Sequence, residues 1–286
     1  MILRIYFFLM VSATLLPGLE PDPHLLDNGS IRLGVDKGSG ASVFFLGESK
    51  TKRNLLNHAD RGRFVQQSFY GTTDGSKWSQ KPWRWNPVQG GNWKGKPSFL
   101  ESFKSDKTSL YSKTIPHHWA GEHLIRSVRM EQWIKLKGKI AEIKFRFTYH
   151  GDTAHPKAHQ ELPAVFMDYA LPNLVFYNGD KPWTGDTLTR VVPGWPNELQ
   201  KSTEHWAAYL DENNWGCGVY FPGTSSLTTY RNQGPPGPVG SGSSYLAPIR
   251  TLAITKGMRL TYQVYFTIGT VEEIRTRFAQ IRKPLK

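Results

Sequence analysis

A chain of 286 residues with 38% hydrophobic residues is long enough to bury a full core without disulfide bonds or a structural metal. Its single cysteine, Cys217, excludes an intrachain disulfide, and its net charge of +13 favours polyanionic partners. The basic residues are scattered along the chain and no nucleic-acid-binding motif is present, so we expect no nucleic acid as partner. Ten tryptophans are more than a core of this size needs.

The first 20 residues predict a signal peptide for export. Arg4 precedes an apolar run from residue 5 to 16, which has the length of a signal-peptide core and is shorter than the roughly 20 residues that cross a bilayer. The position of cleavage stays open, and an uncleaved anchor is the alternative. We therefore expect a secreted or periplasmic protein, with one domain over residues 21–286 and no membrane contact beyond the signal segment.

The rest of the chain predicts a succession of antiparallel strands. Apolar and polar residues alternate over short segments that are separated by Gly, Asn and Lys-Gly turns. The longest pair of segments is joined at Lys137-Gly138 and predicts a hairpin. In chain order, the predicted strands are 31–35, 41–46, 60–70, 110–115, 123–136, 140–149, 162–167, 174–177, 204–210, 215–221, 252–255 and 259–268.

One helix is predicted, at the C-terminal end. Thr270 is placed to cap it, and Glu273 follows three residues later as the second half of a capping box. Ile274 and Phe278 then share a face that can dock on the strands. The fold class is therefore all-β, an antiparallel β-sandwich with one C-terminal helix.

The segment from His58 to Trp93 is the strongest functional signal. It places four tryptophans after the polar residues Asp60, Arg61, Arg63, Gln66 and Gln67, among glycines and prolines, with no sustained period after residue 72. Flat aromatic rings beside planar hydrogen-bonding groups suit a polyhydroxylated ligand. We expect this segment to form one wall of a sugar site, in which the substrate-binding residues are Arg61, Arg63, Gln66, Gln67, Tyr70, Trp83, Trp85 and Gln89.

A second irregular stretch is expected to form the opposing wall. Residues 182–200 carry the motifs PWTGD and PGWPNE, and the chain continues into Glu204 and Trp206. We expect Trp183 and Trp206 to bind sugar as well. The spatial prediction is that Trp83 or Trp85 faces Trp183 or Glu204 across one cleft.

Two kinds of bond cleavage remain open for such a site. Glycoside hydrolysis needs two carboxyl groups about 5–10 Å apart, and the candidates are Asp60, Glu131, Glu161 and Glu204. A polysaccharide lyase needs a group that neutralises a uronate carboxylate and a base that removes the C5 proton. For the lyase, Arg61, Arg63, Gln66 or Gln67 could neutralise the carboxylate, and Tyr70, His117 or His118 could act as the base.

Metal and cofactor motifs are weak or missing. His155 and His159 have the spacing of a metal pair on a helix, but Pro156 disfavours a helix there. No phosphate-binding Gly loop, dinucleotide fingerprint or Ser-His-Asp signature is present. We expect neither a metal nor a cofactor.

Several stretches resemble known sequences. The opening LLDNGSIRLGVDKGSGASVFFL and the strand pair EHWAAYLDENNWGCGVYFP resemble the galactose mutarotase-like super-sandwich. The stretches NLLNHADRGRFVQQSFYG, PWRWNPVQGGNW and QELPAVF are similar to uncharacterised exported proteins of environmental bacteria related to polysaccharide-degrading enzymes. The resemblance implies a sandwich with a concave sugar-binding face, and it transfers no catalytic residue.

These observations predict an exported carbohydrate-active enzyme that cleaves glycosidic bonds of a polysaccharide or oligosaccharide, and an anionic glycan is one option for the substrate. Hydrolysis is favoured slightly, because acidic residues outnumber lyase bases near the tryptophans. A polysaccharide lyase is the first alternative. A non-catalytic glycan-binding protein, with the same aromatic residues and no acid pair, is the second.

Overall fold

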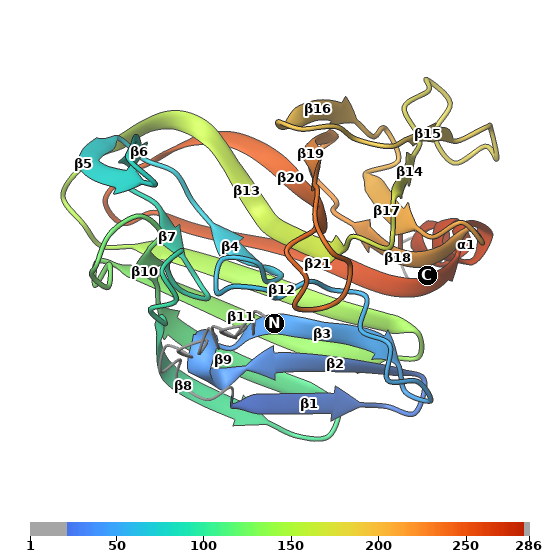
Figure 1. Cartoon of the computed structure of the whole chain (residues 1–286), viewed down its shortest axis with the longest axis horizontal. Helices are drawn as coiled ribbons and strands as arrows, with labels where there is room; N and C mark the ends of the chain where they lie inside the picture. The colour runs from blue at the N-terminus through green and yellow to red at the C-terminus, as the bar shows by residue number, and fades with distance from the viewer. Residues whose placement is uncertain (1–21, 283–286) are drawn as a thin grey trace, which may run out of the picture.

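Antiparallel strands make up most of the structure, a computed structural model that describes residues 22–282. They form one nine-stranded sheet, one seven-stranded sheet, one three-stranded sheet and a separate two-stranded hairpin (Figure 1). The signal peptide predicted for residues 1–20 lies outside the described residues.

The nine-stranded sheet has the strand order β15-β14-β17-β18-β21-β12-β11-β9-β8, and every neighbouring pair is antiparallel. Its centre is the pair predicted around Lys137-Gly138, in register from Val128 opposite Tyr149 to Lys137 opposite Ile140. The strands are β8 (Phe99–Ser105), β9 (Ser109–Ile115), β11 (Val128–Lys137), β12 (Ile140–Tyr149), β14 (Asn173–Phe176), β15 (Thr189–Val191), β17 (Trp206–Leu210), β18 (Trp215–Tyr220) and β21 (Arg259–Thr270).

The seven-stranded sheet has the order β10-β7-β4-β13-β20-β19-β16. Its strands are β4 (Gln66–Ser68), β7 (Pro87–Val88), β10 (His117–His118), β13 (His155–Asp168), β16 (Glu198–Lys201), β19 (Ser226–Asn232) and β20 (Ser243–Ile254). The three-stranded sheet contains β1 (Pro23–Asp27), β2 (Ile31–Asp36) and β3 (Ser42–Glu48), with a short 3-10 helix η1 (Lys37–Ser39) between the last two. The separate hairpin is β5 (Thr73–Trp78) with β6 (Lys81–Arg84).

The three larger sheets share one cluster of buried apolar side chains. In β12, Ile143, Phe145 and Phe147 are fully buried while the residues between them are partly exposed, because successive side chains of a strand point to opposite faces. Phe69, next to β4, stacks on Phe147 with ring centroids 3.8 Å apart. The predicted antiparallel sandwich is therefore confirmed, and each large sheet has one face in the core and one outer face.

The C-terminal helix α1 (Val271–Arg282) forms as predicted. The Glu273 amide donates to Thr270 Oγ1 at 3.3 Å and the Thr270 amide donates to Glu273 Oε2 at 3.1 Å, which is a capping box. Ile274 and Phe278 pack against Gly218 of β18, where a side chain would collide with them. The helix thus covers one end of the outer face of the nine-stranded sheet. Among residues 22–282, no helix is long and apolar enough to span a membrane.

Three local predictions differ from the structure. The strand expected over residues 60–70 is limited to Gln66–Ser68, because residues 60–63 turn, with the Arg63 amide bonded to the Asp60 carbonyl. Strand β13 begins at His155, earlier than its apolar half indicates. Strand β20 begins at Ser243, well before the strand predicted over residues 252–255, and the loop over residues 234–242 before it accepts three hydrogen bonds from the buried Asn57 amide.

Candidate functional site

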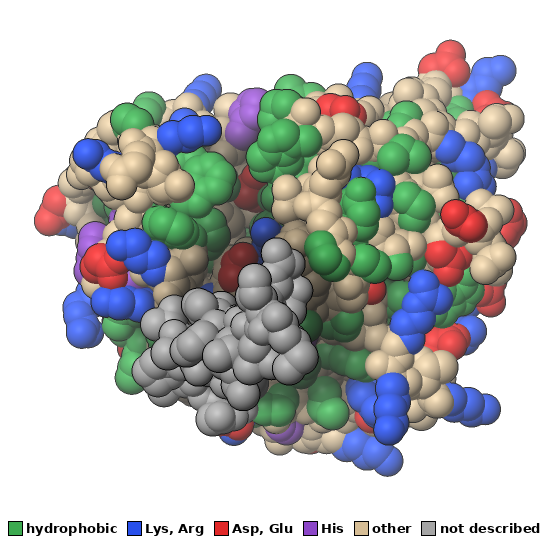
Figure 2. Space-filling view, in the orientation of Figure 1, with side chains coloured by type: hydrophobic (Ala, Val, Ile, Leu, Met, Phe, Trp, Pro, Cys, Tyr) green, Lys and Arg blue, Asp and Glu red, His purple; other side chains and the backbone are tan. Residues whose placement is uncertain are grey.

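A cleft of about 750 Å³ lies over the outer face of the seven-stranded sheet, which is the size of a ligand-binding pocket. One wall comes from the β5–β6 hairpin and the other from the segment around Trp195. In the space-filling view the molecule is hollowed between two groups of hydrophobic side chains, with acidic and basic groups inside the hollow (Figure 2). Eight aromatic residues line the cleft, namely Tyr70, Trp78, Trp83, Trp119, Phe166, Trp195, Tyr230 and Tyr245.

Glu161 is the carboxylate of the cleft floor. It lies on β13, where Lys157 and His159 also line the cleft because residues two apart in a strand share a face. The Tyr70 hydroxyl donates a hydrogen bond to Glu161 Oε2 at 2.7 Å. Burial raises the pKa of Glu161, and hydrogen bonds from Tyr70 and Tyr245 oppose that rise.

The two tyrosines beside Glu161 are kept neutral. Burial is the main cause that raises the pKa of Tyr70 and Tyr245 well above the ordinary value, and the negative charge of Glu161 adds to it. Both phenols therefore remain protonated at physiological pH and act as hydrogen-bond donors. A carboxyl with a raised pKa between fixed donors is suited to general acid–base catalysis.

The first wall holds its indole rings in place through polar contacts. Asn86 Oδ1 accepts a hydrogen bond from Trp83 Nε1 at 3.1 Å, and Asn86 Nδ2 donates to the Phe69 carbonyl at 2.7 Å. Trp78 meets Trp83 edge to face, with centroids 5.4 Å apart. The amide of Gln66 is bonded to the backbone of Gly62 and Gly90, so it presents a fixed polar surface to the cleft.

The opposing wall carries an exposed tryptophan. Trp195 has 60% of its surface exposed, and it meets Tyr230 edge to face with centroids 4.9 Å apart. Tyr230 in turn stacks on Tyr245 at 4.4 Å. These two tyrosines are directly opposite in the β19–β20 pairing. An exposed indole at the edge of an aromatic cleft is a typical contact for a sugar ring.

Of the residues predicted from the sequence, Gln66, Tyr70, Trp83 and Glu161 line this cleft. Three others lie in the turn before β4. Asp60 and Arg63 form an ion pair at 3.1 Å, and burial raises the pKa of Asp60 although Arg63 opposes it. Arg63 also donates to the Ser241 carbonyl at 2.6 Å, and Arg61 donates to the Gly38 and Gly95 carbonyls.

Four predicted site residues point away from the cleft. Gln67 donates to the Glu131 carbonyl and Gln89 donates to the Gly40 carbonyl, both at 3.2 Å, so these amides serve the interior of the sandwich. Trp85 stacks on His155 with centroids 4.1 Å apart. His118 is buried, with Nε2 2.7 Å from Asp74 Oδ2 and Nδ1 accepting from the Ala120 amide.

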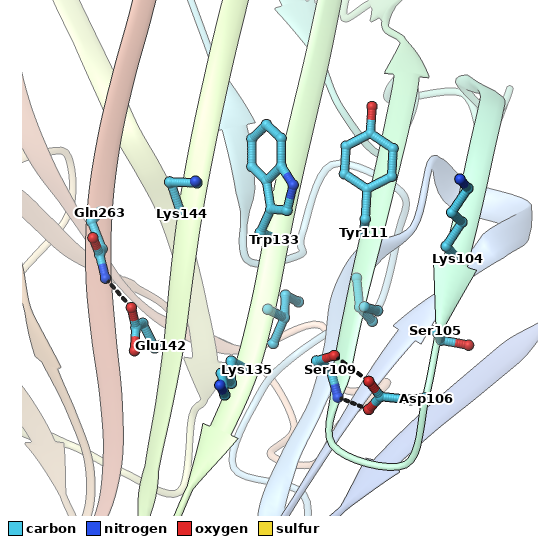
Figure 3. A pocket seen from close by; sticks show the side chains of 12 residues that line it. Lys104, Ser105, Asp106, Ser109, Tyr111, Trp133, Lys135, Glu142, Lys144 and Gln263 are labelled. Carbon is cyan, nitrogen blue, oxygen red and sulfur yellow. Dashed lines mark hydrogen bonds between the residues drawn. The ribbon is translucent and has the colours of Figure 1, made fainter.

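Glu131 is also away from the cleft, on the opposite side of the sandwich. It belongs to the outer face of the nine-stranded sheet, where it accepts a hydrogen bond from the Tyr111 hydroxyl at 2.9 Å and pairs with Arg146 at 3.5 Å. Tyr111 stands on that face next to Trp133 (Figure 3). Glu131 therefore cannot act on a ligand bound over β13.

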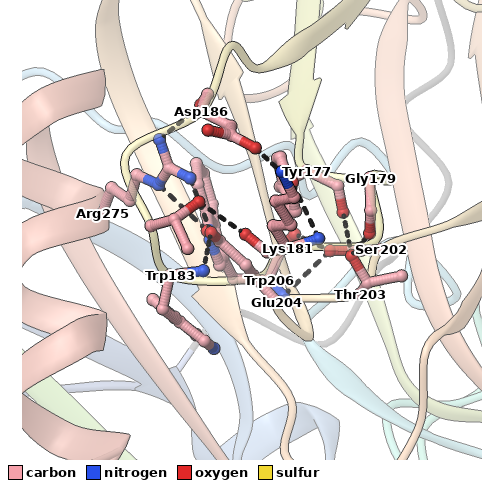
Figure 4. A network of polar contacts seen from close by, with 11 residues as sticks. Tyr177, Gly179, Lys181, Trp183, Asp186, Ser202, Thr203, Glu204, Trp206 and Arg275 are labelled. Carbon is pink, nitrogen blue, oxygen red and sulfur yellow. Dashed lines mark hydrogen bonds and ion pairs between the residues drawn. The ribbon is translucent and has the colours of Figure 1, made fainter.

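Glu204 is fully enclosed in a polar network that joins the 177–206 region to helix α1 (Figure 4). Its two oxygens accept hydrogen bonds from Arg275 at 2.6 and 3.0 Å, from the Trp183 amide and from Trp206 Nε1. The prediction that Trp83 or Trp85 faces Trp183 or Glu204 is therefore wrong. The wall opposite Trp83 is instead formed by Trp195 and its neighbours.

Sequence reasoning missed the residues that strand pairing brings to the cleft, chiefly Trp195, Tyr230, Tyr245, Lys157 and His159. Pro156 disfavours a helix at this point, and the polar residues that follow it alternate as in a strand. A signal was present in that alternation, because Lys157, His159 and Glu161 recur at the two-residue period of a strand. In the part of the chain that the structure describes, no group of three His, Cys, Asp or Glu side chains could hold a metal ion.

The sequence matches no protein-family model and no curated protein. The fold, however, is similar to that of solved galactose mutarotase-like proteins. A galactose mutarotase-like protein from Lactobacillus casei aligns with a TM-score of 0.55 and 9% identity over 86% of this chain and 99% of its own. A galactose mutarotase related enzyme from Lactobacillus acidophilus gives 0.55 and 9% over 86% and 97%.

A third structure, a protein from Escherichia coli K12 with a proposed aldose 1-epimerase activity, gives a TM-score of 0.55 and 11% identity over 86% of this chain and 98% of its own. The chain therefore has the galactose mutarotase-like fold predicted from its sequence. At this level of identity the likeness concerns the fold alone.

Proposed function

We propose that the cleft binds a saccharide and that Glu161, together with His159, transfers protons to and from it. The observation that carries this proposal is a single buried carboxyl group, held by two neutral tyrosines, at the floor of an aromatic cleft. The galactose mutarotase-like fold, which is found in proteins named for sugar chemistry, agrees with a carbohydrate ligand.

The size of the cleft favours an oligosaccharide over a single sugar. Its volume of about 750 Å³ lies between two aromatic walls, so rings such as Trp83 and Trp195 can stack on the CH faces of different sugar units. Lys157 and Arg84 add positive charge at the cleft. An oligosaccharide that carries carboxylate groups would fit both the rings and the charge.

Interconversion of anomers is the reaction for which a carboxyl and an imidazole suffice. Ionised Glu161 would take the proton of the C1 hydroxyl while protonated His159 donates a proton to the ring oxygen, so that the C1–O5 bond breaks and an open-chain aldehyde forms. Rotation about C1–C2 and the reverse proton transfers close the ring to the other anomer. Both groups return to their starting protonation states.

Elimination is a second candidate, because two cationic side chains, Lys157 and Arg84, line the cleft together with Glu161. Their charges could neutralise a uronate carboxylate while Glu161 or His159 removes the C5 proton. The bond from C4 to the glycosidic oxygen then breaks, a C4=C5 double bond forms, and a neutral tyrosine protonates the leaving oxygen. Because burial raises the pKa of Tyr70, this phenol is protonated at the start of the step and can supply a proton but not remove one.

Hydrolysis, which the sequence favours slightly, needs a second carboxyl near the scissile bond. Among the described residues that line the cleft, Glu161 is the one carboxylate. Of the other candidate acids, Asp60 is held in an ion pair with Arg63 next to the lining residue Gly62. The geometry therefore supports hydrolysis less well than proton transfer by Glu161 and His159. Export to the periplasm or the medium remains part of the proposal, on the strength of the N-terminal sequence alone.

The experiment is a saccharide panel followed by NMR, with neutral and uronate-containing oligosaccharides. Exchange between anomer signals identifies mutarotation, new olefinic protons identify elimination, and new reducing ends without olefinic protons identify hydrolysis. Glu161→Gln should abolish whichever signal appears, whereas Glu212→Gln, in the exposed turn between β17 and β18, should leave it unchanged. Conversion that survives Glu161→Gln would overturn the proposal.

A further inference from the structure

A second groove, of about 570 Å³, lies on the outer face of the nine-stranded sheet, on the opposite side of the sandwich from the cleft. Helix α1 covers the β17–β18 end of this face, and the groove lies nearer the other end, over β8, β9, β11, β12 and β21. Tyr111 and Trp133 stand side by side there, with Lys104 and Lys144 beyond them (Figure 3). None of these residues has a part in the cleft.

The side chains of the groove form one continuous row across five strands. Pairwise register places Lys104 opposite Tyr111, Tyr111 opposite Trp133, Trp133 opposite Lys144 and Lys144 opposite Gln263. With strands about 4.8 Å apart, the row is about 19 Å long. This length can hold several sugar units laid across the strands.

Trp133 and Tyr111 provide an aromatic platform that is not used by the core. Their ring centroids are 5.2 Å apart, and both side chains are partly exposed on a face whose opposite side carries the buried Ile134 and Leu110. The Lys144 ammonium lies 4.5 Å from the Trp133 ring centroid. Flat rings on a sheet surface bind sugar rings through CH contacts.

The charges around the platform are of two kinds. Within residues 22–282, Lys104, Lys135 and Lys144 line the groove without an ion pair to a carboxylate, and Lys144 contacts the Trp133 ring. The carboxylates Asp106 and Glu142 lie among them and accept hydrogen bonds from Ser109 and Gln263. Positive groups suit carboxylates of a glycan, and interspersed acids suit its hydroxyls.

We propose that this row is a second saccharide site, which binds a uronate-containing polysaccharide and holds it on the protein away from the cleft. A nucleic acid fits less well, because its backbone brings one phosphate per nucleotide and would lie against Asp106 and Glu142. A polyuronate also brings one charge per sugar unit, but its free hydroxyl groups can donate hydrogen bonds to the same carboxylates, which a DNA backbone cannot do. The site stands on residues independent of the proposed catalytic cleft.

The test uses polygalacturonate as the probe and measures binding by affinity electrophoresis at moderate salt. Trp133→Ala and the double variant Lys104→Gln/Lys144→Gln should each weaken binding roughly tenfold, which corresponds to about 1.4 kcal/mol. The matched double variant Lys50→Gln/Lys52→Gln removes the same charge from an exposed loop elsewhere and should weaken binding by less than about twofold. Equal effects of the two double variants would overturn the proposal, because they would indicate attraction by net charge alone.

A second measurement does not depend on whether Trp133→Ala folds. The indole N–H signal of Trp133, assigned as the signal lost in Trp133→Phe, should shift in the wild-type protein when polygalacturonate is added. Single-stranded DNA of equal charge should shift it less. An unmoved Trp133 signal, or a larger shift with DNA, would contradict the site. Conversion of short oligosaccharides in the cleft should be unchanged in Trp133→Ala, so failure here and failure of the proposed function are distinguishable.

Discussion

At the scale of single residues, Glu161 differs from the other acids of the chain by its surroundings. Burial raises its pKa, whereas ion pairs and hydrogen bonds lower the pKa of surface acids such as Glu101. The sequence contains Glu161 among several acids and does not distinguish it, because Tyr70 and Tyr245 are brought to it from 91 and 84 residues away by strand pairing. This is why the candidate acids could be listed from the sequence but not ranked.

The Tyr70 hydrogen bond gives a prediction for the titration of Glu161. Tyr70→Phe removes a donor that favours the ionised carboxylate, so the pKa of Glu161 should rise further. A base whose pKa is higher loses activity at a higher pH as the solution is acidified, so the acidic limb of kcat/KM should move upward too. Carbon-13 NMR of labelled glutamate, with Glu161 assigned through Glu161→Gln, measures the pKa directly.

Tyr111→Phe is the matched control, because it removes a hydrogen bond to Glu131 on the far side of the sandwich. It should leave the Glu161 titration unchanged.

The raised pKa of Glu161 also makes its contribution to folding stability depend on pH. The folded state holds the proton more tightly than the unfolded state, so the contribution of Glu161 to stability is present below its unfolded pKa and is lost as pH rises through the folded pKa. A fall in the Glu161 pKa in Tyr70→Phe would be inconsistent with this arrangement.

At the scale of elements, the β5–β6 hairpin is attached to the molecule by few contacts. Most of its residues are exposed, and Asp74 accepts a hydrogen bond from His118 Nε2 at 2.7 Å. Because His118 Nδ1 accepts from the Ala120 amide, the neutral ring carries its proton on Nε2, and burial lowers the pKa of His118 and so favours that neutral form. The hairpin carries Trp78 and Trp83, so its anchoring bears on the first wall of the cleft.

Loss of this anchor should loosen the hairpin without unfolding the protein. In Asp74→Ala, the amides of residues 73–84 should exchange with deuterium roughly fivefold faster or more, while those of β13 stay protected. Hydrogen exchange read by mass spectrometry measures this. Asp106→Ala removes a comparable carboxylate from the exposed β8–β9 turn and should leave residues 73–84 unaffected. If the amides of residues 73–84 exchange at the same rate in Asp74→Ala as in Asp106→Ala, the contact to His118 does not stabilise the hairpin.

Helix α1 is anchored by the buried carboxylate of Glu204, which pairs with Arg275 of the helix. Glu204→Gln leaves the Arg275 guanidinium without its charged partner in a site where the carboxylate side chain is fully buried. Breaking such a pair costs roughly 3–5 kcal/mol of unfolding free energy. Urea denaturation should show this loss, with Glu212→Gln changed by less than about 0.5 kcal/mol. A catalytic Glu204 would behave differently, since its substitution would abolish activity with little loss of stability.

At the scale of the whole molecule, the fold could be predicted from the sequence, whereas the residues that line the cleft could not. Alternation and turn chemistry in residues 128–149 and the capping box at Thr270 specify local structure, so the sandwich and its helix could be predicted. The cleft depends on long-range pairing, as in Tyr230 with Tyr245 and Trp83 across from Trp195, which no local pattern contains. Trp183 and Glu204 misled the prediction because a polar network and a sugar site use the same residue types.

The central claim is that Glu161 acts chemically on a saccharide that the aromatic walls bind. The most direct measurement is the comparison of kcat and of substrate affinity between wild type and Glu161→Gln, on the saccharide that the wild-type protein converts. The account predicts that kcat falls by roughly 10²–10⁴, as expected for loss of a general acid or base, while affinity stays within a few-fold. A Glu161→Gln variant that keeps its kcat within about tenfold of wild type would contradict the account.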